Sequence, residues 1–401
     1  MKPIILSLLV ASSAFAQLVP WVVETSAIPS AGTGDPSFVY VPRPPTTGVR
    51  LIVGTDPNLA GVFLWEPGQL PTVLPVGLVK AADARGPMLV VSSSTGNTVL
   101  VFHVSNTGNV TQLDTGGFNV PTPGFIALSQ GTDGGFEVWV DTSSQTVEHF
   151  AMSAVVDGGV TFRALSTITV PQTPTGLAVD DRRRRLYVAQ PTLGVLTVEP
   201  NGNQDFLISI DAGQLGVVVG GLDLFLAADG GTLVFSAAPA DEQVKVHAHV
   251  GTQAPFRAAL QFGDTDGGGA RLTLPRSVDV FEQPLPGFPK GLLVIEDGAS
   301  HNYKVVSLVD VDAVFPLPAP FGAPPAPADA GVSDGGTTDG GAPADGGTGG
   351  GGGSSGSGGG SGRPSGPGPG VEPTPACGCT GGPFAMLPAL LLLWWIRRLR
   401  S

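Results

Sequence analysis

The run Arg182-Arg183-Arg184-Arg185 is the first feature of the sequence whose residue types could do chemistry. Guanidinium groups bind phosphate through paired hydrogen bonds, so four together could form a phosphate-binding patch. The run follows Asp180-Asp181 and lies between two apolar stretches, which is the pattern of a turn between strands. We therefore favour the alternative, a solvent-exposed turn.

Two short groups could bind a metal ion. His247 and His249 alternate on one predicted strand and would share a face, but no third ligand is identifiable beside them. The segment 264–267, Asp-Thr-Asp-Gly, resembles the start of a calcium loop and lacks the later Glu of an EF-hand. Asp-Gly-Gly also occurs at Asp133, Asp157 and Asp229, which indicates a preferred turn. Residues 17–321 contain no G-x-S-x-G, P-loop or H-E-x-x-H motif.

The only cysteines, Cys377 and Cys379, lie near the C-terminus, which excludes a disulfide framework or a cysteine nucleophile in the rest of the chain. They precede an apolar run, 383–396, and then three arginines, Arg397, Arg398 and Arg400. This order resembles the three-part C-terminal sorting signal of myxobacterial surface proteins, which implies processing at the cysteines. The alternative is a short permanent anchor, although the run is shorter than the roughly 20 residues of a transmembrane helix.

Composition divides the ends of the chain from its body. Residues 1–16 have the pattern of a secretory signal peptide, with Lys2, an apolar run and cleavage after Ala16. The body is then 17–321, followed by a stalk, 322–376, so rich in Gly, Pro and Ser that it is expected to be disordered. Residues 377–401 form the sorting segment. We expect an exported protein at the cell surface or outer membrane, or released from it, that touches a membrane only through its tail.

The overall composition predicts a folded, turn-rich and acidic protein. The 401 residues include 59 Gly and 38 Pro, and the formal net charge is −13 at pH 7. A hydrophobic fraction of 42% is enough to build a core. Nucleic acid is excluded as a partner because backbone binding needs a basic face. We expect a monomer.

Short β-branched and aromatic runs, cut by Gly, Pro, Asn and Asp, predict about two dozen strands in the body. One open sheet rarely reaches that size, which leaves paired sandwiches, a β-helix or a propeller. An apolar hairpin with an Asp- or Gly-rich turn recurs at 177–189 and 224–236, and with a longer loop at 38–54. At about 50 residues a unit, the prediction is an all-β, six-bladed β-propeller.

These hairpins resemble, in the same order, those of the β-propeller phytases, six-bladed calcium-dependent phosphatases that act on inositol hexakisphosphate (phytate). The stretches that carry the resemblance are 34–42 with 51–55, 81–85, 175–189, 221–230, and 278–280 with 291–298. The resemblance implies a 3-phytase-type phosphomonoester hydrolase with Ca²⁺ as its cofactor. In this family, acidic residues hold Ca²⁺ ions that bind the substrate phosphates and activate water.

The resemblance also implies site residues. The candidate metal ligands are Asp35, Asp83, Asp279 and Asp297, and Arg85 would contact phosphate. The candidate catalytic residues are Asp35, Asp83 and Arg85.

Several other acids of the family are replaced. Gly34 stands where a second acid precedes Asp35, and Thr175 and Gly220 stand where the family has Glu. Loss of several carboxylates removes charge and geometry from a shared multi-metal site, so we expect weakened or lost hydrolysis. Whether the chain is an enzyme stays open. The alternative is a non-catalytic surface propeller that binds a glycan, peptide or protein instead of phytate.

Overall fold

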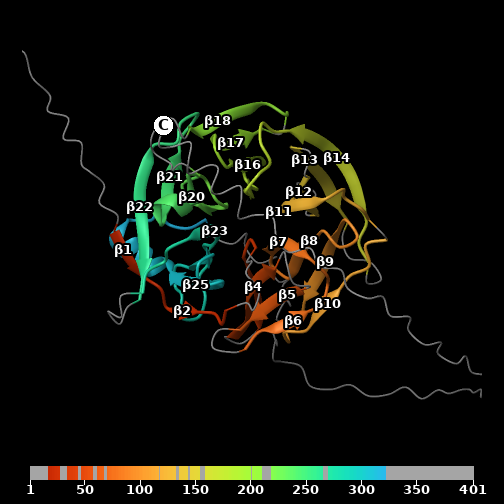
Figure 1. Ribbon diagram of the computed structural model, residues 1–401, viewed down its shortest axis with the longest axis horizontal. Coiled ribbons are helices and arrows are strands. Elements are labelled where there is room, and N and C mark those ends of the chain that lie inside the picture. The colour runs from red at the N-terminus through yellow and green to blue at the C-terminus, as the bar shows by residue number, and fades with distance from the viewer. Residues whose placement is uncertain are drawn as a thin grey trace, which may run out of the picture. The chain divides into compact units, whose positions relative to one another are not determined.

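The structure, a computed structural model, describes residues 17–27, 34–43, 47–56, 61–66, 70–116, 118–131, 135–142, 145–153, 159–199, 201–209, 218–264 and 270–321. They form six twisted, mainly antiparallel sheets around one axis (Figure 1). The predicted all-β, six-bladed propeller is confirmed. The predicted signal peptide, stalk and sorting segment, with Ala16, Cys377 and Cys379, lie outside the described residues.

Blades 1 to 3 each take four consecutive strands. Blade 1 has β3 (Ser37–Arg43), β4 (Thr47–Asp56), β5 (Gly61–Trp65) and β6 (Thr72–Leu74). Blade 2 has β7 (Val79–Arg85), β8 (Met88–Ser93), β9 (Thr98–Val104) and β10 (Val110–Gln112). Blade 3 has β11 (Pro123–Gln130), β12 (Phe136–Thr142), β13 (Thr146–Met152) and β14 (Phe162–Thr169).

Blades 4 to 6 follow, and the last two are completed by N-terminal strands. Blade 4 has β15 (Gly176–Asp180), β16 (Arg185–Gln190), β17 (Gly194–Val198) and β18 (Gln204–Ser209). Blade 5 has β19 (Leu222–Leu226), β20 (Thr232–Ala238), β21 (Gln243–His249) and β22 (Phe256–Gly263), with β1 (Gln17–Pro20) at its edge. Blade 6 has β23 (Pro275–Phe281), β24 (Leu292–Asp297) and β25 (Asn302–Ser307), with β2 (Val23–Glu24) at its edge.

The first strands of the blades surround the axis. They contact one another in chain order, β3, β7, β11, β15, β19 and β23, and β23 contacts β3. Among the described residues, six clusters of buried apolar side chains fill the six interfaces between neighbouring blades. Because each sheet is covered on both faces, strands such as β8 are buried along their whole length.

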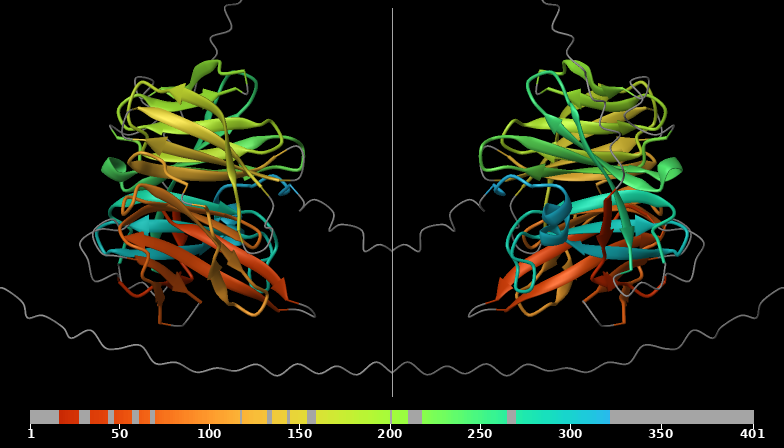
Figure 2. Two further views of the ribbon diagram at one scale, coloured as in Figure 1. Left: turned by 90° about the vertical axis from the view of Figure 1, so that its right-hand side faces the viewer. Right: turned by 90° about the vertical axis from the view of Figure 1, so that its left-hand side faces the viewer.

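The N-terminal strands close the ring. β1 pairs in parallel with β22, and β2 pairs antiparallel with β25. Between them, the Trp21 N–H donates to the Gly263 carbonyl at 3.1 Å, and the Val22 N–H donates to the Val305 carbonyl at 2.8 Å. Figure 1 and the right-hand view of Figure 2 show red N-terminal strand beside the green and blue strands of the last two blades. The first and last parts of the body are therefore held together by main-chain hydrogen bonds.

The end of the body lies against blade 5. A short helix, α1 (Leu308–Val314), begins after Ser307, whose hydroxyl accepts a hydrogen bond from the Val309 N–H at 3.2 Å. Further on, the Phe321 N–H donates to the Leu226 carbonyl at 2.7 Å. Across the described ranges, no helix combines the length and apolar character needed to span a membrane.

Candidate functional site

Four aspartates from different blades interact around the axis. Asp35 comes just before β3, Asp83 lies in β7, Asp223 in β19 and Asp279 in β23. Besides burial, the charges of Asp223, Asp83 and Asp35 raise the pKa of Asp279, whereas a hydrogen bond from Asp279 lowers the pKa of Asp223. The structure thus brings together three of the four predicted metal ligands. It adds Asp223, which lies in the stretch 221–230 but was not among the predicted ligands; the ring of inner strands places it beside them.

These carboxylates bind the main chain or a hydroxyl of a neighbouring blade. The Leu128 N–H of blade 3 donates to Asp83 Oδ2 at 2.6 Å. The Val280 N–H of blade 6 donates to Asp223 Oδ2 at 2.7 Å. The Ser277 hydroxyl of blade 6 donates to Asp35. Asp35, Asp83 and Asp223 therefore link one blade to the next, and we call these three and Asp279 the axial acids.

Arg85 supplies positive charge to the same region. Its Nε donates to the Leu128 carbonyl at 3.1 Å and lies 3.6 Å from Asp181 Oδ2. Asp83 and Glu282 also interact with the guanidinium electrostatically. The predicted phosphate-binding arginine is thus surrounded by carboxylates and carbonyls.

Burial changes the protonation of this cluster. It raises the pKa of Asp83 and of Glu282 to about 7, although the Arg85 charge lowers both. The pKa of Asp279 lies well above its usual range because of burial and then the nearby charges of Asp223 and Asp83. Asp279 and Asp223 share a hydrogen bond between their carboxyl groups. Part of the cluster is therefore protonated at neutral pH.

We expect the melting temperature of the protein to fall by about 3–6 °C between pH 6.5 and pH 8.5. Carboxyls with raised pKa values stabilise the fold while protonated, so their contribution is lost as pH rises through about 7. The buried His247 has its pKa lowered to about 4 and acts in the opposite direction below pH 6.5, so the comparison starts there. Calorimetry at constant ionic strength measures the effect.

The Asp279→Asn variant is the matched control for this prediction. Its amide can donate to Asp223 as a protonated Asp279 does, and it cannot ionise. The fall with pH should be smaller in this variant. A melting temperature that rises over the same range would contradict the assignment.

The axial acids do not fit a multi-calcium array. They offer the hard oxygen donors that Ca²⁺ requires, but Asp35, Asp83 and Asp223 already accept hydrogen bonds from neighbouring blades. Arg85 places a fixed cation among them. In the part of the chain that the structure describes, no group of three or more His, Cys, Asp or Glu side chains could hold a metal ion.

The fourth predicted ligand, Asp297, makes its contacts inside blade 6. Its Oδ1 accepts from the Ala299 N–H at 3.1 Å, and its Oδ2 lies 3.7 Å from Lys304 Nζ. The side chain is buried at the end of β24. It stabilises the turn to β25.

Close packing explains why two acids of the phytase pattern are absent from this chain. A Cβ atom at Gly34 would collide with the Lys80 carbonyl, and one at Gly220 would collide with the Arg276 carbonyl. The neighbouring strand occupies the space that an acidic side chain would need. Thr175, at a third such position, instead donates its hydroxyl to the Val219 carbonyl at 2.9 Å.

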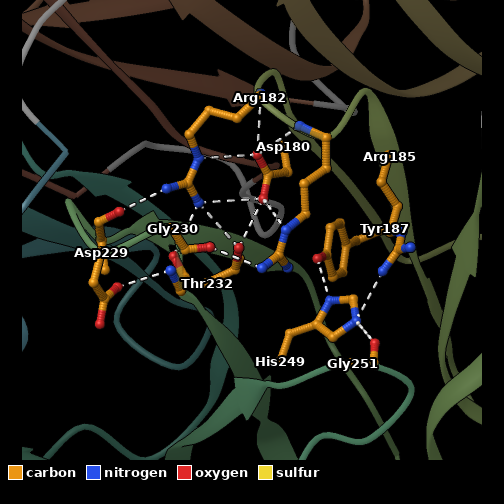
Figure 3. A network of polar contacts seen from close by, with 12 residues as sticks. Asp180, Arg182, Arg185, Tyr187, Asp229, Gly230, Thr232, His249 and Gly251 are labelled. Carbon is orange, nitrogen blue, oxygen red and sulfur yellow. Dashed lines mark hydrogen bonds and ion pairs between the residues drawn. The ribbon is translucent and has the colours of Figure 1, made fainter.

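The run lies at the predicted turn, but three of its four arginines are not free in solvent, because Arg182, Arg183 and Arg185 join blade 4 to blade 5 (Arg182 and Arg185 in Figure 3). Arg184 is exposed and donates to Glu137 of blade 3. Arg182, 16% exposed, is paired with the buried Asp180 at 3.2 Å and donates to the Ala227 carbonyl at 2.6 Å. Thr232 also donates to Asp180, at 2.7 Å. The guanidinium groups thus bind protein acceptors.

The two histidines of β21 are also part of the protein interior. His249 contacts the Tyr187 hydroxyl through Nδ1 at 2.5 Å and the Gly251 carbonyl through Nε2 at 2.8 Å (Figure 3). His247 is fully buried and packs edge-on against Phe256, with ring centroids 5.5 Å apart. Within the described residues, neither belongs to a group that could hold a metal ion.

A cavity of about 260 Å³ lies between blades 3 and 4. Its walls include Glu137, Trp139, His149, Ser166, Arg184 and Asn201. Trp139, His149 and Ser166 are direct cross-strand neighbours on β12, β13 and β14. These residues had no motif in the sequence, because only the strand register places them in one row.

Contacts among the wall residues order the cavity. The His149 ring stacks on Trp139 with centroids 3.4 Å apart and 8° between the planes. His149 Nε2 lies 3.1 Å from Glu137 Oε2, and Nδ1 lies 3.4 Å from Ser166 Oγ. Arg184 Nη2 donates to Glu137 Oε1 at 3.1 Å. The rings and the carboxylate are held in place before any ligand arrives.

No protein-family model matches the chain, and no curated protein matches it. Among solved structures, one similar chain is the calcium-binding protein regucalcin from Agrobacterium tumefaciens str. C58, with 10% identity, 73% of this chain and 95% of that chain covered, and a TM-score of 0.45. Two others are BBS1N in complex with ARL6DN. In the mercury-soaked crystal the identity is 12%, 68% of this chain and 76% of that chain are covered, and the TM-score is 0.41. In the lead-soaked crystal the identity is 14%, 65% of this chain and 75% of that chain are covered, and the TM-score is 0.37.

Proposed function

We propose that this chain is an exported binding propeller in which calcium-dependent phosphomonoester hydrolysis is lost. The observation that carries the proposal is the use of the axial carboxylates. Asp83 and Asp223 accept hydrogen bonds from the inner strands of neighbouring blades, so their role is to hold the ring together.

Two further features support loss of hydrolysis. The close packing at Gly34 and Gly220 leaves no space for the acids of the phytase pattern. Arg85 interacts with Asp83, Asp181 and Glu282, so phosphate would have to displace carboxylates from its guanidinium. Without added positive charge, this acidic region repels a phosphate group.

Display outside the cell is supported by the ends of the sequence. Residues 1–16 have the pattern of a signal peptide, and 377–401 have the order of a sorting segment. Such a protein meets ligands of its surroundings through its folded body. Sequencing the N-terminus of the exported protein tests the cleavage site, with Gln17 expected as the first residue.

We expect no phosphate release from phytate above background, with or without Ca²⁺, when the purified protein is assayed. The axial acids that would hold the metal are already hydrogen-bonded to the fold. A colorimetric phosphate assay measures this, with a catalytically active phytase as the positive control. Calcium-dependent release that is abolished by Asp35→Ala would overturn the proposal and restore the predicted axial site.

A further inference from the structure

We propose that the cavity between blades 3 and 4 binds a small neutral polyhydroxylated ring, such as one monosaccharide unit. The inference rests on the proposed binding function and names the ligand class. The inference is based on the pairing of charges in the wall, on the ordered row of Trp139, His149 and Ser166, and on the size of the cavity.

Each carboxylate in the cavity wall is matched by an arginine. Glu137 pairs with Arg184 at 3.1 Å, Glu199 pairs with Arg185, and Asp181 lies 3.6 Å from Arg85. An anionic ligand would meet the carboxylates, and a cationic ligand would meet the guanidinium groups. A neutral ligand avoids both repulsions.

The same groups suit hydroxyl ligands. Arg184 uses one nitrogen for Glu137 and keeps a side chain that is 44% exposed, so it can donate further hydrogen bonds. Carboxylate oxygens accept more than one hydrogen bond each. Ser166 and Asn201 add exposed polar side chains at the wall. Alternating donors and acceptors of this kind match neighbouring hydroxyls on a ring.

The row of Trp139, His149 and Ser166 forms an ordered wall of the cavity. Because Glu137 lies at His149 Nε2, a proton on that nitrogen leaves Nδ1 as the acceptor that faces the Ser166 hydroxyl. Burial lowers the pKa of His149, so the ring is neutral at neutral pH. The buried Ile168 and Val179 add apolar surface to the wall. Polar and apolar surfaces therefore meet in one cavity, as the two sides of a sugar ring require.

The size limits the ligand to a single small ring. Sites for drug-sized ligands occupy about 300–1,000 Å³, and this cavity holds about 260 Å³. Phytate, with its six phosphates, is both too large and of the wrong charge.

The test uses the purified full chain and ligand-observed NMR with four neutral probes: glucose, galactose, mannose and N-acetylglucosamine. Inorganic phosphate and spermidine are the anionic and cationic counter-probes. The variants are Ser166→Ala and Arg184→Gln. The matched control is Thr111→Ala on β10, which is the outermost strand of blade 2 as β14 is of blade 3. Near-ultraviolet circular dichroism checks that each variant is folded.

We expect at least one neutral probe to bind, with its affinity reduced about fivefold or more in Ser166→Ala and Arg184→Gln and changed less than about twofold in Thr111→Ala. Binding of phosphate or spermidine that the two variants weaken would overturn the ligand class. Sugar binding with the same affinity in Ser166→Ala and Arg184→Gln as in the unchanged protein would overturn the assignment of the site. Absence of sugar binding would overturn the inference and leave the proposed function standing, whereas calcium-dependent phosphatase activity would contradict the proposed function whatever the sugars do.

Discussion

A chain that lacks residues 17–25 is expected to lose the cooperative thermal unfolding of the complete propeller. The deletion removes β1 and β2, and with them the pairing to β22 and β25. It also removes Val19 and Trp21 from the core cluster between blades 5 and 6. An open ring exposes the edges of both blades and the apolar surface between them. Calorimetry should show a broad transition at lower temperature, and size-exclusion chromatography should show aggregation.

Two neighbouring point variants distinguish the loss of ring closure from a nonspecific effect of changing the N-terminal segment. Trp21 is 8% exposed, and Lys304 Nζ lies 4.7 Å from its ring centroid, so Trp21→Ala should lower the free energy of unfolding by about 3–5 kcal/mol. Val22 is 49% exposed, and Val22→Ala should change it by less than about 0.5 kcal/mol. A deletion variant that melts as the complete protein does would show that the ring closes without these strands.

Asp180→Ala is expected to lower the free energy of unfolding by about 3–5 kcal/mol, or the melting temperature by roughly 10 °C. The carboxylate is fully buried and accepts hydrogen bonds from Arg182 Nε at 3.2 Å and the Thr232 hydroxyl at 2.7 Å. Its removal leaves the Arg182 guanidinium, which is 16% exposed, without its ion pair. A buried charge that has lost its partner is costly because water cannot replace the lost interaction.

The matched control for this prediction is Asp229→Ala in the hairpin turn of blade 5. Asp229 is exposed, and its Oδ1 accepts one hydrogen bond, from the Gly231 N–H at 2.8 Å. We expect a loss of about 1 kcal/mol or less in this variant. Equal losses in the two variants would show that Asp180 acts as an ordinary turn residue and that the contact between blades 4 and 5 adds little.

The hairpins could be predicted from the sequence because their signals are local. Residues 177–189 contain two apolar runs around an Asp- and Arg-rich turn, and the structure pairs β15 with β16 there. The same holds for 224–236, where β19 pairs with β20. Their recurrence was enough to predict six blades. The roles of β1 and β2 could not be predicted, because their partners lie some 240 or more residues away in the chain.

The site was predictable only in part. Matching motifs selected Asp35, Asp83 and Asp279, and the ring of inner strands brings these three together. Whether a carboxylate near the axis binds a metal or an N–H group depends on which atoms the next blade places beside it. For Asp83 that atom is the Leu128 nitrogen, 45 residues away. No local pattern records such a distance.

The sequence by itself determined the strands, their turns and the number of blades, because alternation, turn residues and repeat length act over short stretches of chain. Only the tertiary structure decided what the charged residues do. Arg182 and Arg183 form a contact between blades because the turn of blade 5 places the Ala227 and Gly230 carbonyls beside them. Trp139, His149 and Ser166 became the wall of a cavity through the register of three strands. Charges and hydrogen bonds act over a few ångströms, so their partners are set by the closed ring of blades.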